Sequence, residues 1–541
     1  MRAFFACFLI LISGPAWCQI DLVKDINPSG DSYPQHFMIF DGKLYFCADD
    51  HTNGYALWNS DGTANGTYMI RDFHMHTSSY NGHVTPLIVF NNKLYLEVVN
   101  GDPVTELWVT NGTDAGTALL KSINANGNSH MTGFTEMNGS LYFAANDGTN
   151  GTELWKSNGI PMGTLMLKDI NGSGDSDPAN LTVFKDKLYF SATDEFQDEE
   201  LWVSDGSALG TSKLKDLASG WAGSPHEFTV MGDYLYFAVN GNHEDQELWR
   251  TDGTTLGTTG VADIFVGGDA QLSGLTVCND ELYFAARDGI HGVELWKTDG
   301  TAQGTVMVRD IYEGPESSWP DQLYVFSHQL WFRAQDQLHG FELWSSDGTA
   351  DGTTLFADLV ATGNGSPHDF ITYNRRLVFV GAWEGNSSAL YSTQGVPGQV
   401  TIYMPTVAPN TNPLGAETEF AIANGLLFPA NYNDAGSELY KLVLSILGTG
   451  PDMEIAGVSI GVFPNPARES TTVRITGFPA GDIRICLTDL TGKTRMERSL
   501  TITDAISGIV TQLELTDLPQ GVYLLSVNGS GVLRCQKVIV E

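Results

Sequence analysis

The chain of 541 residues has few cysteines and few positive charges. Only 6 cysteines are present, which excludes a dense disulfide framework, and no pair of them has the spacing of a zinc site. The 28 Lys and Arg residues stand against 64 Asp and Glu residues, for a net charge of −36. This balance argues against a nucleic-acid partner, because phosphate binding needs Lys and Arg.

Long apolar runs are also lacking, so no stretch predicts a transmembrane helix. The apolar run Ala3–Ile12 is too short to cross a bilayer. Together with the small residues that follow it, this run predicts a secretory signal over residues 1–18, cleaved between Cys18 and Gln19. A lipoprotein signal anchored at Cys18 is the alternative, and Trp17 directly before that cysteine disfavours it.

A regular repeat is the most informative feature that the chain does have. Its anchors are Leu57-Trp58, Leu107-Trp108, Leu154-Trp155, Leu201-Trp202, Leu248-Trp249, Leu295-Trp296, Leu343-Trp344, Leu390-Tyr391 and Leu439-Tyr440. The aromatic residues of successive anchors lie 47 to 50 positions apart. A period in this range is typical of a propeller or another repeat array. A residue that recurs in every unit is therefore first interpreted as part of the scaffold.

Each unit reads as four short strands separated by turns. In the third unit the strand-like segments are residues 133–137, 140–145, 153–157 and 164–170, and each break carries Asn, Asp or Gly. Four strands and four connections of ordinary length account for about 46 residues. Four strands per unit make one propeller blade. Alternation within Glu-Leu-Trp places Leu on one face of the sheet and Trp on the other, where it suits the contact between neighbouring blades.

The two ends of the repeat array complement each other. The last unit lacks a fourth strand, and the segment Asp21–Ile26 has the sequence of that strand without a unit before it. Pairing the two would close a ring and remove two exposed sheet edges. The sequence thus predicts an all-β protein: a β-propeller of about nine four-stranded blades and a small C-terminal β-sandwich. Eight blades remain the alternative, since nine exceeds the usual number.

The cysteines outside the predicted signal fall into two groups. Cys47 and Cys278 occupy positions that other units fill with Ala, Ser or Phe, so we interpret them as small core residues. Cys486 and Cys535 lie on two candidate strands of the C-terminal segment. The sequence leaves open whether these two form a disulfide.

One recurring loop is a candidate calcium site. Oxygen-bearing residues alternate after the fourth strand of a unit, and such residues can ligate a hard cation. The candidates are Asn27, Ser29 and Asp31 in one loop and Asn171, Ser173, Asp175 and Asp177 in another. The alternative, which the sequence favours, is that these residue types simply form turns. No other cofactor is predicted.

Histidines and paired carboxylates offer weaker candidates. His74, His76 and His83 form a cluster that could bind a metal, whereas most other histidines recur at fixed repeat positions. The run Asp198 to Glu200 is interpreted as a solvated face rather than a hydrolytic pair. The chain offers no phosphate loop, nucleophile elbow or zinc helix, so no catalytic residue is proposed.

The repeat units resemble the ELWxxDGT repeat of secreted bacterial proteins. The resemblance is close at Glu294–Thr301, where the sequence reads ELWKTDGT, and at residues 342–349 and 247–254. It covers roughly residues 20–445. It implies a secreted β-repeat protein and carries over no functional residue.

The C-terminal segment resembles the type A sorting domain of the type IX secretion system of the Bacteroidetes. Four motifs in the right order carry the resemblance, and their residues include Pro464, Asn465, Pro466, Asp489, Gly492, Lys493, Gly521, Tyr523 and Lys537. The resemblance implies that the type IX machinery is a partner. It also implies passage through the periplasm and then secretion or display on the outer-membrane surface.

These observations predict a signal at residues 1–18, a propeller at 19–446, a linker at 447–457 and a sorting domain at 458–541. The function predicted for the whole is that of a non-enzymatic binding or adhesion module for an extracellular glycan or protein. The alternative is an extracellular propeller enzyme, a hydrolase or lyase acting on polysaccharide, because propeller funnels host such sites on a fold that does not itself dictate function.

Overall fold

The computed structural model divides the chain into two compact units, whose main segments are Ile20–Lys441 and Leu442–Glu541. It describes residues 18–73, 83–99, 104–218, 222–240, 246–361, 363–383, 387–397, 399–403, 414, 418–431, 436–444, 459–463, 470–476, 481–489, 494–502, 509–515, 518–529 and 532–540. The predicted linker lies outside these residues. Among the helices of the described part, none is long and apolar enough to cross a membrane.

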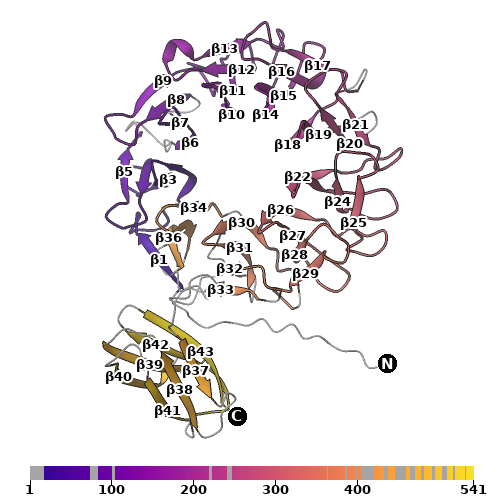
Figure 1. Cartoon of the computed structure of the whole chain (residues 1–541). Helices are drawn as coiled ribbons and strands as arrows, with labels where there is room; N and C mark the ends of the chain where they lie inside the picture. Colours follow the sequence, from indigo (N-terminus) through magenta and orange to yellow (C-terminus); the bar gives the residue numbers. More distant parts are fainter. Residues whose placement is uncertain are drawn as a thin grey trace. The chain divides into compact units, whose positions relative to one another are not determined.

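Nine four-stranded sheets, the blades, make up the first unit and follow one another around a ring (Figure 1). Eight of them use consecutive strands, which run in order from the ring centre outward. They are β2 (Gln35–Phe40), β3 (Lys43–Asp49), β4 (Tyr55–Ser60) and β5 (Tyr68–Arg71); β6 (His83–Phe90), β7 (Lys93–Val99), β8 (Thr105–Thr110) and β9 (Ala118–Lys121); β10 (Thr132–Met137), β11 (Ser140–Asn146), β12 (Thr152–Ser157) and β13 (Leu165–Lys168); β14 (Ala179–Phe184), β15 (Lys187–Thr193), β16 (Glu199–Ser204) and β17 (Ser212–Lys215); β18 (His226–Met231), β19 (Tyr234–Asn240), β20 (Gln246–Thr251) and β21 (Thr259–Ala262); β22 (Ser273–Cys278), β23 (Glu281–Ala286), β24 (Glu294–Thr298) and β25 (Val306–Arg309); β26 (Asp321–Phe326), β27 (Gln329–Ala334), β28 (Glu342–Ser346) and β29 (Thr354–Ala357); and β30 (His368–Tyr373), β31 (Arg376–Trp383), β32 (Ser387–Thr393) and β33 (Thr401–Tyr403).

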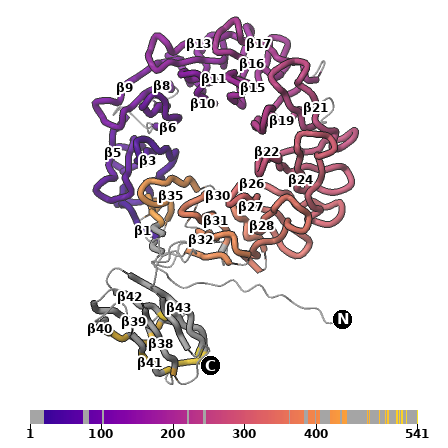
Figure 2. Tube along the Cα trace, viewed as in Figure 1, coloured from indigo at the N-terminus to yellow at the C-terminus, as the bar shows by residue number. Residues whose placement is uncertain are grey.

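The ninth blade closes the ring with strands from both ends of the propeller. Its order is β1 (Cys18–Lys24), β36 (Glu438–Leu444), β35 (Leu426–Ala430) and β34 (Ala421–Ile422). Figure 2 shows the indigo N-terminal strand beside the orange end of the array. The predicted closure and the count of nine blades are both confirmed.

Local sequence explains the hairpins within a blade. Between β10 and β11, Asn138 and Gly139 have φ values of 51° and 71°, and Met137 pairs with Ser140. Positive φ at both central residues of a two-residue turn gives the twist that adjacent strands require, and Asn-Gly adopts it readily. The blade also contains the 3₁₀ turn η1 (Pro161–Gly163) between its third and fourth strands.

Blades pack through the two faces that the anchor pair presents. Leu439 of the ninth blade and Trp58 of the first share one buried cluster with Val23 and Ile26. Leu from one blade therefore meets Trp from the next, as the alternation predicted. Cys47 and Cys278 are buried free cysteines in such clusters, which confirms their interpretation as core residues.

The second unit consists of two antiparallel sheets. Their orders are β37 (Ser459–Phe463), β38 (Ser470–Thr476) and β41 (Ile509–Glu514), and β40 (Thr494–Ile502), β39 (Gly481–Asp489), β42 (Gly521–Gly529) and β43 (Val532–Val540). Cys486 pairs with Ser526, which in turn pairs with Cys535. Two strand spacings, about 9.6 Å, separate the two cysteines. A disulfide needs Cα atoms less than about 7 Å apart, so this sheet order does not support one.

Candidate functional site

The Glu of each Glu-Leu-Trp anchor serves the scaffold. Glu153 is fully buried, and its carboxylate accepts hydrogen bonds from the backbone N–H groups of Ile170 (2.6 Å) and Asn171 (3.3 Å) and from the hydroxyl of Ser176 (2.7 Å). We call this arrangement the glutamate clamp. Glu294 and Glu438 also accept backbone N–H groups and a serine hydroxyl, whereas Glu342 accepts the N–H groups of Leu359 and Gly365. The clamp holds the end of the fourth strand against the third. Burial raises the pKa of Glu153 above its ordinary value.

The Asp-Gly-Thr part of the motif forms a turn that touches the preceding blade. Asp299 accepts hydrogen bonds from the N–H (2.8 Å) and hydroxyl (2.7 Å) of Thr301, and these bonds lower the pKa of its carboxyl. Gly300 has φ of +93°, and a Cβ there would lie 2.2 Å from the hydroxyl of Tyr236. Its carbonyl accepts a bond from Arg250 at 2.7 Å. The Asp-Gly-Thr residues of the repeat therefore form the turn and contact the preceding blade.

The first candidate calcium loop forms a turn closed on itself. Asn27 donates to the carbonyl of Asp31 at 2.8 Å and accepts from the N–H of Ser29 at 3.1 Å. Asp31 accepts from the N–H of Ser437 at 2.5 Å, which adds a tie across the closed ring. Three of the candidate oxygens therefore already have partners, and calcium binding at this loop stays a prediction.

The second candidate loop repeats this geometry. Asn171 donates to the carbonyl of Asp175 at 2.8 Å and accepts from both the N–H and the hydroxyl of Ser173. Asp175 accepts from the N–H of Thr152 at 2.6 Å. Burial, followed by the charge of Asp175, raises the pKa of Asp177. The bonds are those of Asn- and Asp-initiated turns, and here too calcium stays a prediction.

Of the three candidate histidines, only His83 lies in the described part of the chain. His74 and His76 lie outside the described residues. His83 has both ring nitrogens in contact, with Gln35 at 3.2 Å and with Thr85 at 3.3 Å, and burial lowers its pKa. The repeat-position histidines behave alike in pairs: the rings of His226 and His368 both contact a carbonyl two residues earlier.

The processing and sorting residues are placed in part. Cys18 and Gln19 begin β1, and residues 1–17 lie outside the described part of the chain. Pro464, Asn465, Pro466, Gly492 and Lys493 also lie outside it. Asp489 ends β39 and pairs with Tyr523 of β42, which Gly521 begins, and Lys537 lies in β43. The motifs after the first therefore fall on or beside neighbouring strands of one sheet.

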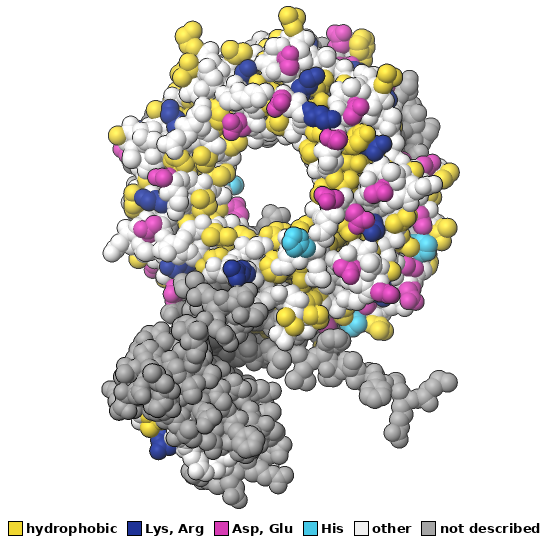
Figure 3. Space-filling view, in the orientation of Figure 1, with side chains coloured by type: hydrophobic (Ala, Val, Ile, Leu, Met, Phe, Trp, Pro, Cys, Tyr) yellow, Lys and Arg dark blue, Asp and Glu magenta, His cyan; other side chains and the backbone are white. Residues whose placement is uncertain are grey.

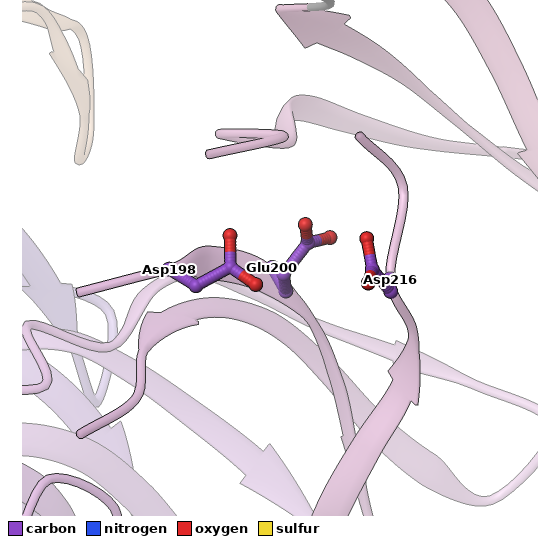
Figure 4. A group of neighbouring side chains, drawn as sticks. All are labelled: Asp198, Glu200 and Asp216. Carbon is purple, nitrogen blue, oxygen red and sulfur yellow. The ribbon is translucent and has the colours of Figure 1, made fainter. Parts of the chain in front are cut away.

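The interpretation of Asp198 to Glu200 as a solvated face is wrong for Glu200. This residue is fully buried because it occupies the clamp position of its blade, where it accepts the N–H of Leu217 at 2.8 Å. Alignment with Glu153 could have shown this. Figure 4 shows its carboxylate facing those of Asp198 and Asp216.

The surface that the sequence analysis missed is the wall of the central channel, open in Figure 3. The first strands of five consecutive blades, β10, β14, β18, β22 and β26, line a concave region of about 670 Å³. At one repeat position each presents a partly exposed Phe or Leu, namely Phe134, Leu181, Phe228, Leu275 and Leu323. Figure 3 shows hydrophobic side chains gathered around this opening. The repeat carried this signal, because each of these five strands has a Phe or Leu three residues before its last residue.

The residue directly before each of these apolar ones differs between blades. The five residues are Gly133, Asn180, Glu227, Gly274 and Gln322. All five have positive φ, because the strand bulges there and its register shifts. The carboxylate of Glu227 accepts the N–H of Leu275 in the next blade at 2.9 Å, and Glu419 likewise accepts the N–H of Phe37 at 2.5 Å. The wall thus combines a constant apolar row with a neighbouring position that is polar in three of these blades and glycine in two.

Fold and site define a nine-bladed β-propeller with a variable channel wall, followed by a second all-β unit. Residues 461–541 match the family described as the secretion system C-terminal sorting domain. The chain therefore carries the sorting domain of the type IX secretion system, which indicates export to the cell surface or secretion and an interaction with that machinery. No curated protein matches the chain.

Solved structures resemble the propeller only distantly. They include one titled as an analysis of two prolyl endopeptidases (TM-score 0.41, 11% identity, 76% of this chain and 56% of that one). Others are a puromycin hydrolase (0.35, 12%, 75% and 60%) and a puromycin-hydrolyzing peptidase of Mycobacterium tuberculosis (0.36, 13%, 64% and 57%). The chain spans less than two thirds of the length of each, and at these TM-scores the likeness carries no argument about function.

Proposed function

We propose that the exported protein is a non-enzymatic binding or adhesion module whose extracellular ligand, a glycan or a protein, binds at the channel wall. The observation that carries this proposal is the row of partly exposed Phe and Leu side chains on five consecutive blades. Binding sites are typically concave and largely apolar, with a few polar groups that fix orientation. The wall meets this description, with Asn180 and Gln322 as its polar groups.

The carboxylates of the wall favour binding over hydrolysis. Glu227, Asp369 and Glu419 occupy one repeat position, and each accepts a backbone N–H from the following blade, at 2.9, 2.6 and 2.5 Å. Such bonds tie neighbouring blades together and hold the carboxylates in place. We assign these residues to the ring's structure rather than to acid–base chemistry.

The proposal extends to the organisation of the precursor. We propose cleavage between Cys18 and Gln19, a propeller over residues 19–446, a linker over 447–457 and a sorting domain over 458–541. We also assign the propeller to the ELWxxDGT repeats of the Bacteroidetes. N-terminal sequencing and intact-mass measurement of the secreted protein test the first cleavage; a mature chain that begins elsewhere contradicts it.

The test of binding uses the secreted protein on glycan and protein arrays, followed by affinity measurement for any hit. The channel variant is Leu181→Ala with Leu275→Ala. Its matched control is Leu209→Ala with Leu256→Ala, which removes the same atoms from turns where Leu209 is 100% and Leu256 93% exposed. We expect the channel variant to lose about tenfold or more in affinity, since two apolar contacts of about 1 kcal/mol or more are removed. Equal binding by both variants would refute the channel as the site.

The alternative function is tested with the same preparation. Incubation with extracellular polysaccharides is followed by assays for new reducing ends and for the unsaturated products of a lyase. Turnover that co-purifies with the protein and persists at constant specific activity overturns the non-enzymatic proposal.

A further inference from the structure

Three carboxylates converge at one place in the fourth blade of the repeat array (β14 to β17). Asp198 directly precedes β16 and Glu200 lies within it, so that alternation puts both on one side of the strand. Asp216 directly follows β17, whose Lys215 pairs with Leu201. One oxygen from each of the three carboxylates lies within 4.8 Å of the others. Figure 4 shows the three groups pointing toward a common space.

The site contains a buried carboxylate oxygen without a partner. Glu200 is fully buried; its Oε2 accepts the N–H of Leu217 at 2.8 Å, while its Oε1 has no hydrogen-bond partner among the residues that the structure describes. Within the same part of the chain, Oδ1 of Asp198 is also buried without a partner. An unpaired buried carboxylate oxygen is costly, so this arrangement calls for a proton or a cation.

Comparison with the other blades shows where this arrangement departs from most of the repeat. The residue two places before the clamp Glu is glycine in four other blades, at Gly151, Gly292, Gly340 and Gly436, whereas it is aspartate in this blade (Asp198) and, by sequence, in the next (Asp245). The hydroxyl that completes the clamp in the preceding blade comes from Ser176, and the corresponding residue is Gly223. Relative to the preceding blade, this one has thus gained a carboxylate and lost a hydroxyl donor.

The neighbouring lysine neutralises only part of the charge. Lys213 contacts Oδ2 of Asp194 at 2.7 Å and Oδ2 of Asp198 at 3.2 Å. Lys213 pairs with neither Oδ1 of Asp198 nor Oε1 of Glu200, the two buried oxygens without a hydrogen-bond partner in the described part of the chain. Burial, with the charges of Asp198 and Asp216 adding to it, raises the pKa of Glu200 to about 7.

We propose that Asp198, Glu200 and Asp216 bind a divalent cation, and that calcium is the ion. The donors are all oxygens, which calcium prefers, and two oxygens on opposite sides of a calcium ion lie about 4.8 Å apart. Water would complete the roughly 6 to 8 ligands that this ion takes. The ion would join the start of β16 to the end of β17, which is the connection that the incomplete clamp leaves weak. This site is distinct from the loops of Asn27 and Asn171, and it does not depend on the ligand of the channel.

The experiment titrates chelator-treated full-length mature protein with calcium chloride, using calorimetry and thermal melting at pH 8. We expect one ion per chain from this site, with a dissociation constant between about 10⁻⁵ and 10⁻³ M, from the weak end of the calcium sensors to the extracellular modules. We also expect a melting temperature that rises and saturates with calcium. Because binding displaces the proton on Glu200, affinity should fall at pH 5.5.

The variants separate the site from general surface binding. Asp198→Asn and Asp216→Asn should each weaken calcium binding about tenfold or more. The matched control is Asp169→Asn, which changes the residue equivalent to Asp216 in the preceding blade and should leave the affinity unchanged. Absence of binding by the parent at 5 mM calcium, or equal losses in all three variants, overturns the proposal. The proposal is also overturned if the site only takes up a proton, as a titration that Glu200→Gln abolishes would show, and calcium has no effect on the melting temperature.

Discussion

The ring should depend on a single glutamate clamp that joins the two ends of the propeller. Glu438 is fully buried in the ninth blade and accepts bonds from the N–H groups of Ile26 (2.9 Å) and Asn27 (3.2 Å) and from the hydroxyl of Ser32 (2.7 Å). These bonds span more than 400 residues of sequence. Every other clamp observed in the described blades connects segments of a single continuous unit. Glu438→Ala therefore tests closure in a way that no other clamp variant does.

The expected cost follows from the groups left behind. The substitution strands two backbone donors and one hydroxyl, and each unsatisfied buried group costs about 1–3 kcal/mol. Because such losses do not add fully, we expect Glu438→Ala to lower the free energy of unfolding by about 3–5 kcal/mol. Deleting Asp21–Ile26 should cost more, since it also exposes the edge of β36 and removes the buried side chains of Val23 and Ile26, worth about 1.5–3 kcal/mol each.

The assay is urea unfolding of the secreted protein combined with native-state hydrogen exchange. The control is Glu153→Ala, which removes the same three kinds of bond within one continuous blade. Both variants should lose similar unfolding free energy, but only Glu438→Ala should expose the amides of β1 and β36 to rapid exchange. The reasoning is refuted if the deletion of Asp21–Ile26 unfolds like the parent, or if exchange in Glu438→Ala is no faster at those strands than in Glu153→Ala.

Three further predictions concern export, pH and the turns. Deleting residues 452–541 should leave thermal melting of the propeller nearly unchanged but keep the protein in the periplasm; its appearance in the medium on fractionation would contradict this. The ring should be most stable near pH 5 and lose stability as the pH rises to 8, because burial raises the pKa of Glu342 to about 8 and the folded state therefore holds a proton that the unfolded state has lost. Glu342→Gln should make the melting temperature depend less on pH. A parent protein that is more stable at pH 8 than at pH 5 would refute this reasoning. Gly300→Ala should lower the free energy of unfolding in urea by about 2–4 kcal/mol, because residue 300 has a positive φ and the new Cβ would meet Tyr236. The control Gly232→Ala, at φ of +57° with no atom within 4 Å, should lower it by only about 1 kcal/mol. Equal losses of unfolding free energy in the two variants would show that the contact with Tyr236 does not matter.

Much of the fold follows from the sequence because the repeat averages local signals over nine units. A single Asn-Gly or Leu-Trp pair is weak, but the same pair at a period of 47 specifies four strands and the faces they bury. The ring closes because the ninth unit lacks a fourth strand and the segment Asp21–Ile26, which has no unit before it, supplies that strand. These inferences need only strand periodicity and turn chemistry, and both are encoded within a few residues.

The channel wall could not be predicted by the same means. Its bulged strands place Glu227 at φ of 56° and Gln322 at φ of 56°, a conformation that these residue types rarely adopt alone. Bonds to the next blade support it, as between Glu227 and Leu275 at 2.9 Å. These bonds form only once the blades are assembled, so no local sequence pattern predicts this conformation. The burial of Glu200 was missed for a different reason: a run of acidic residues was weighed by composition instead of by its place in the repeat.

The same comparison indicates where function can lie in a protein of this kind. The constant residues of each unit are occupied: Glu by the clamp, Trp by the blade contact, and Asp-Gly-Thr by the turn that meets the preceding blade. A residue that every blade needs for structure is not free to distinguish one ligand from another. Specificity must then come from positions where blades differ, and the structure shows two such sets. One is the variable position of the channel wall, which is Gly133, Asn180 and Glu227 in three successive blades, and the other is Asp198 beside the buried Glu200, at a position that is glycine in several other blades.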